Sequence, residues 1–305
     1  MIRLWYAIFG FILWVAVSAI SVAQQSEHVA TVNDHAISLN VVHHFLDRSF
    51  QNLPELADRE KRDESVIKIG IEHMVKREII LQHLRTGKFR TSERELDNAI
   101  MELKSRLELT QQTLPSHLEK IQLSEQELRQ EFEWQFSWRR YVTKYVTVEH
   151  LEKQFEEKRK YFDGTKYHVA QILWKQKDKE TTAKAMQVRQ QLVQGNIKWA
   201  DAVKSHSQAA SAAKEGDLGW IGYEGPMPRQ FTRVAFGLAT GEFSQPFESQ
   251  YGIHLIRCIE IEPGSKTFDD VAFELRELET NRLFDLVSTR HRADAAIEIS
   301  GETVR

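Results

Sequence analysis

The periodicity of the apolar residues changes once along this 305-residue chain, at Phe162-Asp163-Gly164. Before that point the apolar residues recur at helical spacing, as in residues 64–84, where they form one broad face. After it, segments with strand character, such as residues 167–174, are separated by amphipathic helices. A chain of this length can hold two domains, each with its own core. We therefore expect a mostly helical domain over residues 24–163 and a mixed domain over residues 164–262.

The helical part begins with a short strand pair and contains clear helix starts. Residues 29–37 alternate apolar and polar residues around Asn33-Asp34, which predicts a β-hairpin. Ser38 is then the expected N-cap of the next helix. Two later helix starts, at Ser92 and Ser124, have the Ser-x-x-Glu spacing of a capping box.

Composition excludes several classes of protein. The 41 basic and 44 acidic residues give a net charge of −3, so the chain lacks the positive excess of a nucleic-acid-binding protein. The single cysteine, Cys258, excludes an intramolecular disulfide framework and any metal site built from several cysteines. Neither the adjacent His43-His44 nor the pair His73 and His83 has the i, i+4 spacing of a helical metal site. We expect no metal and no cofactor.

The first residues form a segment of a different kind. No charged residue occurs from Leu4 to Ala23, although 28% of the whole chain is charged. A basic start, an apolar run and small residues at Ser21 and Ala23 are typical of a signal peptide cleaved after residue 23. The alternative is an uncleaved membrane anchor, because about 20 apolar residues can span a bilayer. Either interpretation places the rest of the chain in the periplasm or another extracytoplasmic space. In the second interpretation, residues 4–23 anchor the chain to the inner membrane.

Four short motifs in fixed order carry a resemblance to a known family. They are Val169-Ala170-Gln171-Ile172-Leu173, Gly216-Asp217-Leu218-Gly219-Trp220, Ala235-Phe236-Gly237-Leu238-Ala239-Thr240-Gly241-Glu242 and Tyr251-Gly252-Ile253-His254-Leu255-Ile256. Together they resemble the parvulin (PpiC-type) family of peptidyl-prolyl cis-trans isomerases. The resemblance implies a four-stranded antiparallel sheet with surrounding helices over residues 164–262.

The regions on either side resemble the helical chaperone part of exported proteins of the SurA and PrsA type. In such proteins the C-terminal segment, here residues 263–305, packs back on the N-terminal domain. The resemblance therefore implies that Ile297–Ile299 pairs with Val29–Val32. The expected fold is α+β, with a mostly helical N-terminal domain, a parvulin domain and a returning C-terminal helix and strand.

The reaction that the resemblance implies needs few functional groups. Rotation about an X–Pro bond meets a barrier of about 18–20 kcal/mol, which a proline shelf, a desolvated carbonyl and one polar group can lower without a nucleophile or metal. The family supplies an apolar shelf, which falls on Met227 and Phe231, and two facing histidines, of which His254 matches the second. The first histidine falls on Gln171, which can donate and accept hydrogen bonds.

Two further positions complete the candidate site. The position where the family has Cys or Asp falls on Ala209, which can neither donate nor accept through its side chain. Trp220 is interpreted as a packing residue, with the rim of the proline pocket as the alternative. The candidate catalytic residues are thus His254 and Gln171, and the candidate substrate-binding residues are Met227, Phe231, Trp220 and Ala209.

Three functional hypotheses follow. The first is an exported prolyl isomerase and folding chaperone that acts on X–Pro bonds of unfolded secreted or envelope proteins, with turnover reduced by Gln171 and Ala209. The second is a chaperone that uses the parvulin unit as a peptide-binding module with little turnover. The third is an assembly protein of an exported machine. The expected partners are unfolded polypeptides that contain proline, with no nucleic acid and no membrane contact beyond an uncleaved N-terminal segment.

Overall fold

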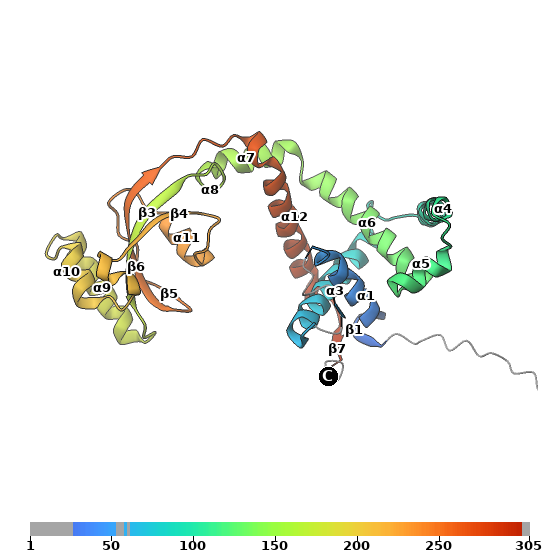
Figure 1. The fold of residues 1–305 in the computed structure, drawn as a ribbon, viewed down its shortest axis with the longest axis horizontal. Coiled ribbons are helices and arrows are strands. Elements are labelled where there is room, and N and C mark those ends of the chain that lie inside the picture. The colour runs from blue at the N-terminus through green and yellow to red at the C-terminus, as the bar shows by residue number, and fades with distance from the viewer. Residues whose placement is uncertain (1–26, 53–57, 60–61, 301–305) are drawn as a thin grey trace, which may run out of the picture. The chain divides into compact units, whose positions relative to one another are not determined.

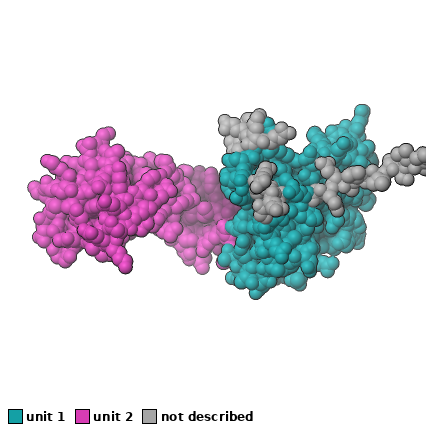
Figure 2. Space-filling model, turned by 90° about the horizontal axis from the view of Figure 1, so that it is seen from below, with its two compact units in different colours: residues 1–134, 288–305 teal, residues 135–287 magenta. Residues whose placement is uncertain are grey.

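The computed structural model describes residues 27–52, 58–59 and 62–300 (Figure 1). The chain divides into two compact units, one of residues 1–134 with 288–305 and one of residues 135–287, which Figure 2 shows in different colours. The predicted signal or anchor segment, residues 1–23, lies outside the described residues. No helix among the described residues is long and apolar enough to cross a membrane.

The first unit contains a three-stranded antiparallel sheet in the order β2-β1-β7. Strands β1 (His28–Val32) and β2 (His35–Ser38) form the predicted hairpin, and Asn33 adopts a left-handed φ of 53° in its two-residue turn. Strand β7 (Ile297–Ile299) pairs with β1 in the register Ala30 to Ile299. The predicted pairing of the C-terminal strand with the hairpin is therefore confirmed.

Five helices lie between the hairpin and residue 134 in the described part of the chain. They are α1 (Leu39–Ser49), α3 (Glu64–Arg85), α4 (Glu93–Leu109), α5 (Leu114–Ile121) and the first turns of α6 (Glu125–Tyr145). The predicted N-cap at Ser38 and the capping boxes at Ser92 and Ser124 are confirmed, since each serine oxygen accepts a backbone N–H of the helix that it starts. The core forms where α1 and α3 cover the hairpin, through residues such as Val32, Leu46 and Val75.

The second unit is built around a four-stranded antiparallel sheet in the order β4-β3-β6-β5. Its strands are β3 (Lys166–Trp174), β4 (Asp217–Gly222), β5 (Phe247–Ser249) and β6 (Gly252–Glu262). Helices α9 (Lys179–Val193) and α10 (Trp199–His206) cover one face, and α11 (Arg229–Ala235) covers the other (Figure 1). A short 3-10 helix, η2 (Ala210–Lys214), precedes β4. The α+β fold that the sequence predicts is confirmed.

The unit boundary differs from the expected domain boundary near Gly164, because it falls inside the continuous helix α6. Helices α7 (Val148–Glu157) and α8 (Arg159–Phe162) belong to the second unit. The reason is packing: Leu151 and Phe155 of α7 form a buried cluster with Leu275 of α12 (Phe268–Arg292). Helical periodicity alone does not tell which partner a helix packs against.

The end of α12 and the strand that follows belong to the first unit. Within that unit Arg292 forms an ion pair with Glu72 at 2.8 Å, and the ring of His291 stacks on that of His83. The backbone N–H of Asn33 donates to the carbonyl oxygen of Ala296 at 2.7 Å. The C-terminal segment is thus an integral part of the N-terminal fold.

Candidate active site

His254 stands at the centre of a buried polar network in the second unit. It lies on β6, where its register partners are Leu173 of β3 and Phe247 of β5. Its Nδ1 atom is 2.9 Å from Oε1 of Gln171, and its Nε2 atom is 2.6 Å from Oγ of Ser249. All three members of this network are buried, with exposed fractions of 4% for His254, 9% for Gln171 and 8% for Ser249.

Each hydrogen bond of this network has an assigned donor and acceptor. Burial lowers the pKa of His254 to about 4, so the imidazole is neutral and carries one proton at pH 7. Because the carbonyl oxygen of Gln171 accepts, the proton is assigned to Nδ1, and Nε2 accepts from the Ser249 hydroxyl. The Ser249 oxygen in turn accepts the backbone N–H of Tyr251 at 3.0 Å. The site thus presents a fixed, uncharged imidazole.

Aromatic side chains enclose the imidazole. Phe231, from α11, is only 1% exposed and meets His254 edge to face, with 5.7 Å between ring centroids. Phe247, from β5, stacks on the imidazole at 5.2 Å. Met227 is partly buried and packs against the same hydrophobic cluster as Phe231. The structure therefore brings together His254, Gln171, Phe231 and Met227 as the sequence analysis expects, and an apolar shelf borders the polar network.

Two glycines allow the strands to approach the site. A Cβ at Gly252, where φ is 139°, would lie 2.0 Å from the carbonyl oxygen of Trp174. A Cβ at Gly216, where φ is 79°, would lie 2.3 Å from the carbonyl oxygen of Gln171. Only glycine fits such backbone conformations at such close range. The absence of a Cβ at these two positions lets β6 and the start of β4 lie close to β3, which carries Gln171.

Ala209 lies half-buried at the start of η2, in the loop that follows α10. The preceding residues tie this loop to the end of β3, because Ser207 Oγ accepts the N–H of Leu173 and the N–H of Gln208 donates to the carbonyl oxygen of Leu173. Leu173 is the register partner of His254. The loop of Ala209 is therefore anchored beside the strand pair that carries the site, but its methyl group adds no polar function.

Trp220 occupies a different place from the other candidate residues. It pairs in register with His168, its ring lies 5.3 Å from that imidazole, and it is 42% exposed. The next residue, Ile221, packs in the same cluster as Phe231. Successive side chains of a strand point to opposite faces. Trp220 therefore lies on the sheet face opposite Phe231, away from the apolar shelf, where it packs on His168.

Sequence reasoning missed Ser249 and Phe247, which both contact the imidazole. The only signal was a hydroxyl residue shortly before Tyr251-Gly252-Ile253-His254. The tight turn between β5 and β6 brings Ser249 back beside His254, with Ser249 paired to Gly252. No group of three or more His, Cys, Asp or Glu in the described part of the chain is arranged to hold a metal ion.

Cys258 is fully buried beneath this site, in the cluster that contains Phe231. Burial raises the pKa of its thiol, and the charge of Glu242 adds to that effect. The thiol is therefore protonated and packs as a small apolar side chain.

Two families match this chain. Residues 168–260 match the family described as the PPIC-type PPIase domain, and residues 1–142 match the SurA-like N-terminal domain. The chain is 31% identical over 199 residues to the foldase protein PrsA of Bacillus subtilis, a match that covers 65% of this chain and 62% of that protein. It is 34% identical over 146 residues to the chaperone SurA of Bordetella avium, covering 46% of this chain and 27% of that protein.

Solved structures are also similar. The crystal structure of the peptidylprolyl isomerase PrsA from Bacillus cereus matches with a TM-score of 0.41 and 19% identity, over 91% of this chain and 95% of that one. In the sequence comparisons, the matched region spans about three fifths of the Bacillus subtilis PrsA sequence and about a quarter of the Bordetella avium SurA sequence. By these family matches, residues 168–260 are similar to PPIC-type PPIase domains and residues 1–142 to SurA-like N-terminal domains, in agreement with the resemblance that the sequence motifs carry.

Proposed function

We propose that this protein is an exported foldase whose parvulin site accelerates cis-trans isomerisation of X–Pro bonds in extended polypeptides. The observation that supports the proposal most directly is the buried, neutral His254, held between Gln171 and Ser249 beside the apolar surface of Phe231. The type of domain and the foldase and chaperone names of the relatives agree with it.

The reaction follows from how an amide rotates. A planar amide is polar, because resonance shifts electron density from nitrogen to oxygen, and that resonance is lost when the bond twists. A site that removes water therefore destabilises the planar form relative to the twisted one. In our proposal the proline ring packs on Phe231 and Met227, and the rotating carbonyl faces the edge of the network formed by Gln171 and His254. No proton transfer is required.

A second candidate function is peptide binding with little turnover, and two residues favour it. Gln171 and Ala209 replace a histidine and a Cys or Asp of the parvulin pattern, whereas the apolar shelf is retained. Hydrophobic contacts with the proline ring do not depend on the missing groups, but polar stabilisation of the twisted amide, whose nitrogen regains its lone pair, does. We therefore expect turnover below that of an intact parvulin site, with peptide affinity preserved.

One experiment separates these two functions. The mature protein is added at catalytic concentration to a refolding protein whose slow phase is proline isomerisation, and peptide affinity is measured in parallel. The proposal is supported if the protein accelerates the slow refolding phase less than an intact parvulin does and still binds the peptide. A rate equal to that of an intact parvulin contradicts reduced turnover, and binding without any acceleration favours the second candidate.

The shelf is tested by Phe231→Ala, with Phe273→Ala as the control. Phe231 is buried against His254, whereas Phe273 lies on α12 and is 70% exposed. Loss of peptide binding in the first variant alone places the proline pocket at Phe231. Unchanged affinity in that variant shows that the pocket is elsewhere.

The proposed location outside the cytoplasm is supported by the uncharged segment from Leu4 to Ala23. The test is to express the full chain in a bacterium, separate the cell fractions and sequence the N-terminus. A mature chain that begins at Gln24 supports cleavage, an intact chain in the membrane fraction supports an anchor, and cytoplasmic recovery contradicts export. Capture of many unfolded clients rather than one fixed partner distinguishes a foldase from an assembly protein.

A further inference from the structure

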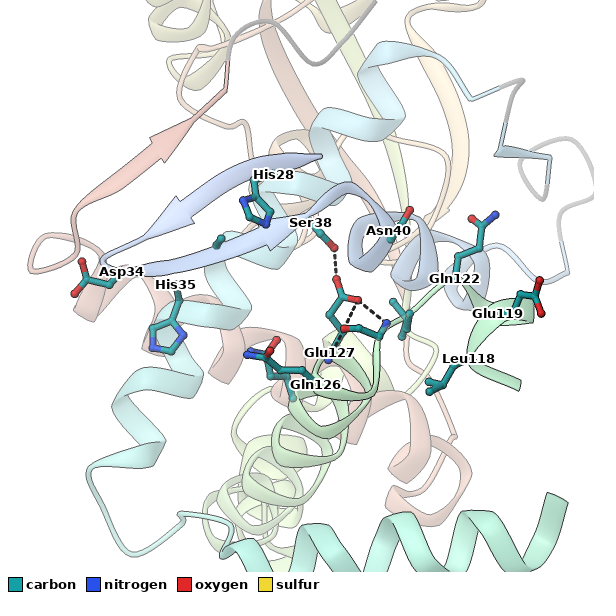
Figure 3. A pocket seen from close by; sticks show the side chains of 14 residues that line it. His28, Asp34, His35, Ser38, Asn40, Leu118, Glu119, Gln122, Gln126 and Glu127 are labelled. Atoms are coloured by element: carbon teal, nitrogen blue, oxygen red, sulfur yellow. Dashed lines mark hydrogen bonds between the residues drawn. The ribbon is translucent and has the colours of Figure 1, made fainter. Parts of the chain in front are cut away.

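The first unit contains a polar groove between the β1–β2 hairpin and the turn that joins α5 to α6 (Figure 3). We call it the hairpin groove. Its volume is about 870 Å³, and its walls come from β2, the start of α1, the end of α5 and the first turns of α6. All of its lining residues belong to the first unit, so the groove is separate from the parvulin site of the second unit.

One wall of the groove is the open edge of a sheet. Strand β2 is the outermost strand in the order β2-β1-β7, and its residue Ala36 is exposed and lines the groove. The two-residue turn makes Val32 and His35 the closing hydrogen-bonded pair of the hairpin. Pairs alternate in an antiparallel ladder, so the N–H and C=O of Ala36 point away from β1. These two groups are available to another strand.

The opposite wall is rich in side-chain amides. Gln126, from α6, and Gln122, at the end of α5, are labelled in Figure 3, and Gln130 of α6 also lines the groove. Asn40, at the start of α1, adds a fourth amide on the side of the hairpin. An amide side chain both donates and accepts hydrogen bonds, as a peptide group does. A wall of this kind matches the backbone of an extended segment whatever its side chains are.

A short bridge holds the two walls together. Ser38 caps α1, and its hydroxyl also donates to Glu127 at 2.5 Å. The other carboxylate oxygen of Glu127 accepts the N–H of Ser124 at 2.7 Å, within the capping box of α6. Figure 3 shows these bonds between the hairpin and α6. The N-termini of α1 and α6 beside the groove are therefore capped by side chains of the protein itself. Both carboxylate oxygens of Glu127 already accept hydrogen bonds within the protein.

The charged residues of the groove indicate which kind of segment it binds. None of the residues that line the groove is Lys or Arg, and Arg59, which donates to the lining residue Gln122, is paired with Asp47. Asp34 and Glu119 present carboxylates at the two ends of the groove, both exposed and neither in an ion pair with a described residue. A segment with positive side chains complements this charge, and a segment with negative side chains is repelled.

We propose that the hairpin groove binds an extended polypeptide segment as an added strand along β2, with a preference for segments that contain Lys or Arg. The main-chain hydrogen bonds are made by Ala36, and the charges of Asp34 and Glu119 set the preference. The four residues of β2 extend over roughly 13 Å, so the bound segment contributes about four residues to the sheet. This site would hold client chains in the first unit, without need of proline and without use of the parvulin residues of the second unit.

The test uses the full chain and a fluorescein-labelled, proline-free decapeptide of alternating Thr and Val in which two Thr are replaced by Lys. The matched peptide has Glu at the same two positions. We expect the Lys peptide to bind at least about tenfold more tightly than the Glu peptide by fluorescence anisotropy. We also expect it to slow amide hydrogen exchange at Ala36 in the unaltered protein, a readout that requires no variant.

Two variants locate the binding. Ala36→Pro removes the outward N–H without removing a bond of the hairpin, because proline is accepted on edge strands, and it is expected to weaken binding about tenfold. The pair Asp34→Asn and Glu119→Gln is expected to abolish the difference between the two peptides. Its control is Glu102→Gln with Glu108→Gln, an equal change of charge at exposed positions of α4.

Phe231→Ala is expected to leave this binding unchanged, so failure of the isomerase proposal and failure of this one are distinguishable. Equal affinity for the Lys and Glu peptides, absence of binding, or unaltered exchange at Ala36 under saturating Lys peptide overturns the proposal.

Discussion

The Nδ1 atom of His254 lies 2.9 Å from the side-chain oxygen of Gln171, a residue 83 positions earlier in the chain. This hydrogen bond joins the two central strands of the parvulin sheet and fixes which imidazole nitrogen carries the proton. In the parvulin pattern the first of the two facing histidines occupies the place of Gln171. The glutamine retains the acceptor but does not titrate, so the site differs from that pattern in electrostatics more than in shape.

The first prediction concerns the pH dependence of activity. Burial holds the pKa of His254 at about 4, so the imidazole keeps one protonation state throughout the neutral range. We expect kcat/KM for a proline peptide to be flat from about pH 5.5 to 8. A bell-shaped profile, or a step near pH 6.5, in the isomerase assay would contradict the neutral assignment.

The same residue links stability to pH. Its pKa is lowered on folding from 6.5 to about 4, so below pH 6.5 the unfolded chain binds a proton that the folded chain does not. Folding stability is therefore complete above pH 6.5 and falls by up to roughly 3 kcal/mol as the pH drops towards 4. Burial also lowers the pKa of His43, His44, His83 and His206, which act in the same direction. The comparison that isolates His254 is urea unfolding of the unaltered protein and of His254→Gln at pH 5 and 7.5, where the variant should lose less stability on acidification.

Gln171→Leu tests the hydrogen bond directly. Leucine is similar in size but accepts no hydrogen bond, which leaves a buried N–H of His254 without its partner. We expect a loss of about 1–3 kcal/mol in the free energy of unfolding, together with reduced turnover. The control is Gln208→Leu, since Gln208 also accepts a backbone N–H, from Lys175 at 2.7 Å, but is exposed. An equal loss of unfolding free energy in the two variants would show that the buried hydrogen bond to His254 contributes no more than an exposed one.

Ala209→Asp and Ala209→Cys test the missing polar group. Both restore a residue type of the parvulin pattern, so we expect each to raise kcat severalfold with little change in KM. Ala209 is also the uncapped N-cap of η2, so the aspartate alone should add about 0.5–2 kcal/mol of stability. A variant that gains stability but no turnover would mean that the position has no part in the reaction.

Gly252→Ala tests the close approach of β6 to β3. The added Cβ would lie 2.0 Å from the carbonyl oxygen of Trp174, at a backbone φ of 139°. We expect a loss of more than about 3 kcal/mol, or failure of the parvulin domain to fold. Gly222→Ala, on β4, is the control because a Cβ there meets nothing within 4 Å. Thermal unfolding followed by circular dichroism compares the two, and similar melting temperatures would refute the steric argument.

The returning strand offers a separate test of the first unit. Ile297 packs against the hydrophobic cluster of the hairpin, whereas Ile299 on the same strand is 49% exposed. Ile297→Asp should cost about 1–3 kcal/mol in the first unit, and Ile299→Asp much less. Hydrogen exchange measured on each unit should show the loss in residues 28–100 and none in the parvulin sheet. Equal protection in both variants would count against the contribution of β7.

The sequence was sufficient for features that depend on local chemistry or on short motifs. The Asn33-Asp34 turn and the capping serines are encoded by residues within one turn of the backbone, because their hydrogen bonds join near neighbours. Two of the four motifs of the parvulin domain contain Gln171 and His254, and each of these motifs forms part of one strand.

Other features required the tertiary structure, because they arise between residues that are far apart in the chain. The unit boundary within α6 follows from the packing of α7 on α12, and the face of Trp220 follows from strand register. The role of Ser249 follows from the turn that returns it to His254, and the lowered pKa of His254 follows from its burial beside Phe231 and Phe247, which come from two other elements. The sequence by itself determined the elements and the class of site, whereas only the tertiary structure decided burial and proton position, because desolvation is the sum of contacts from every element packed around a group.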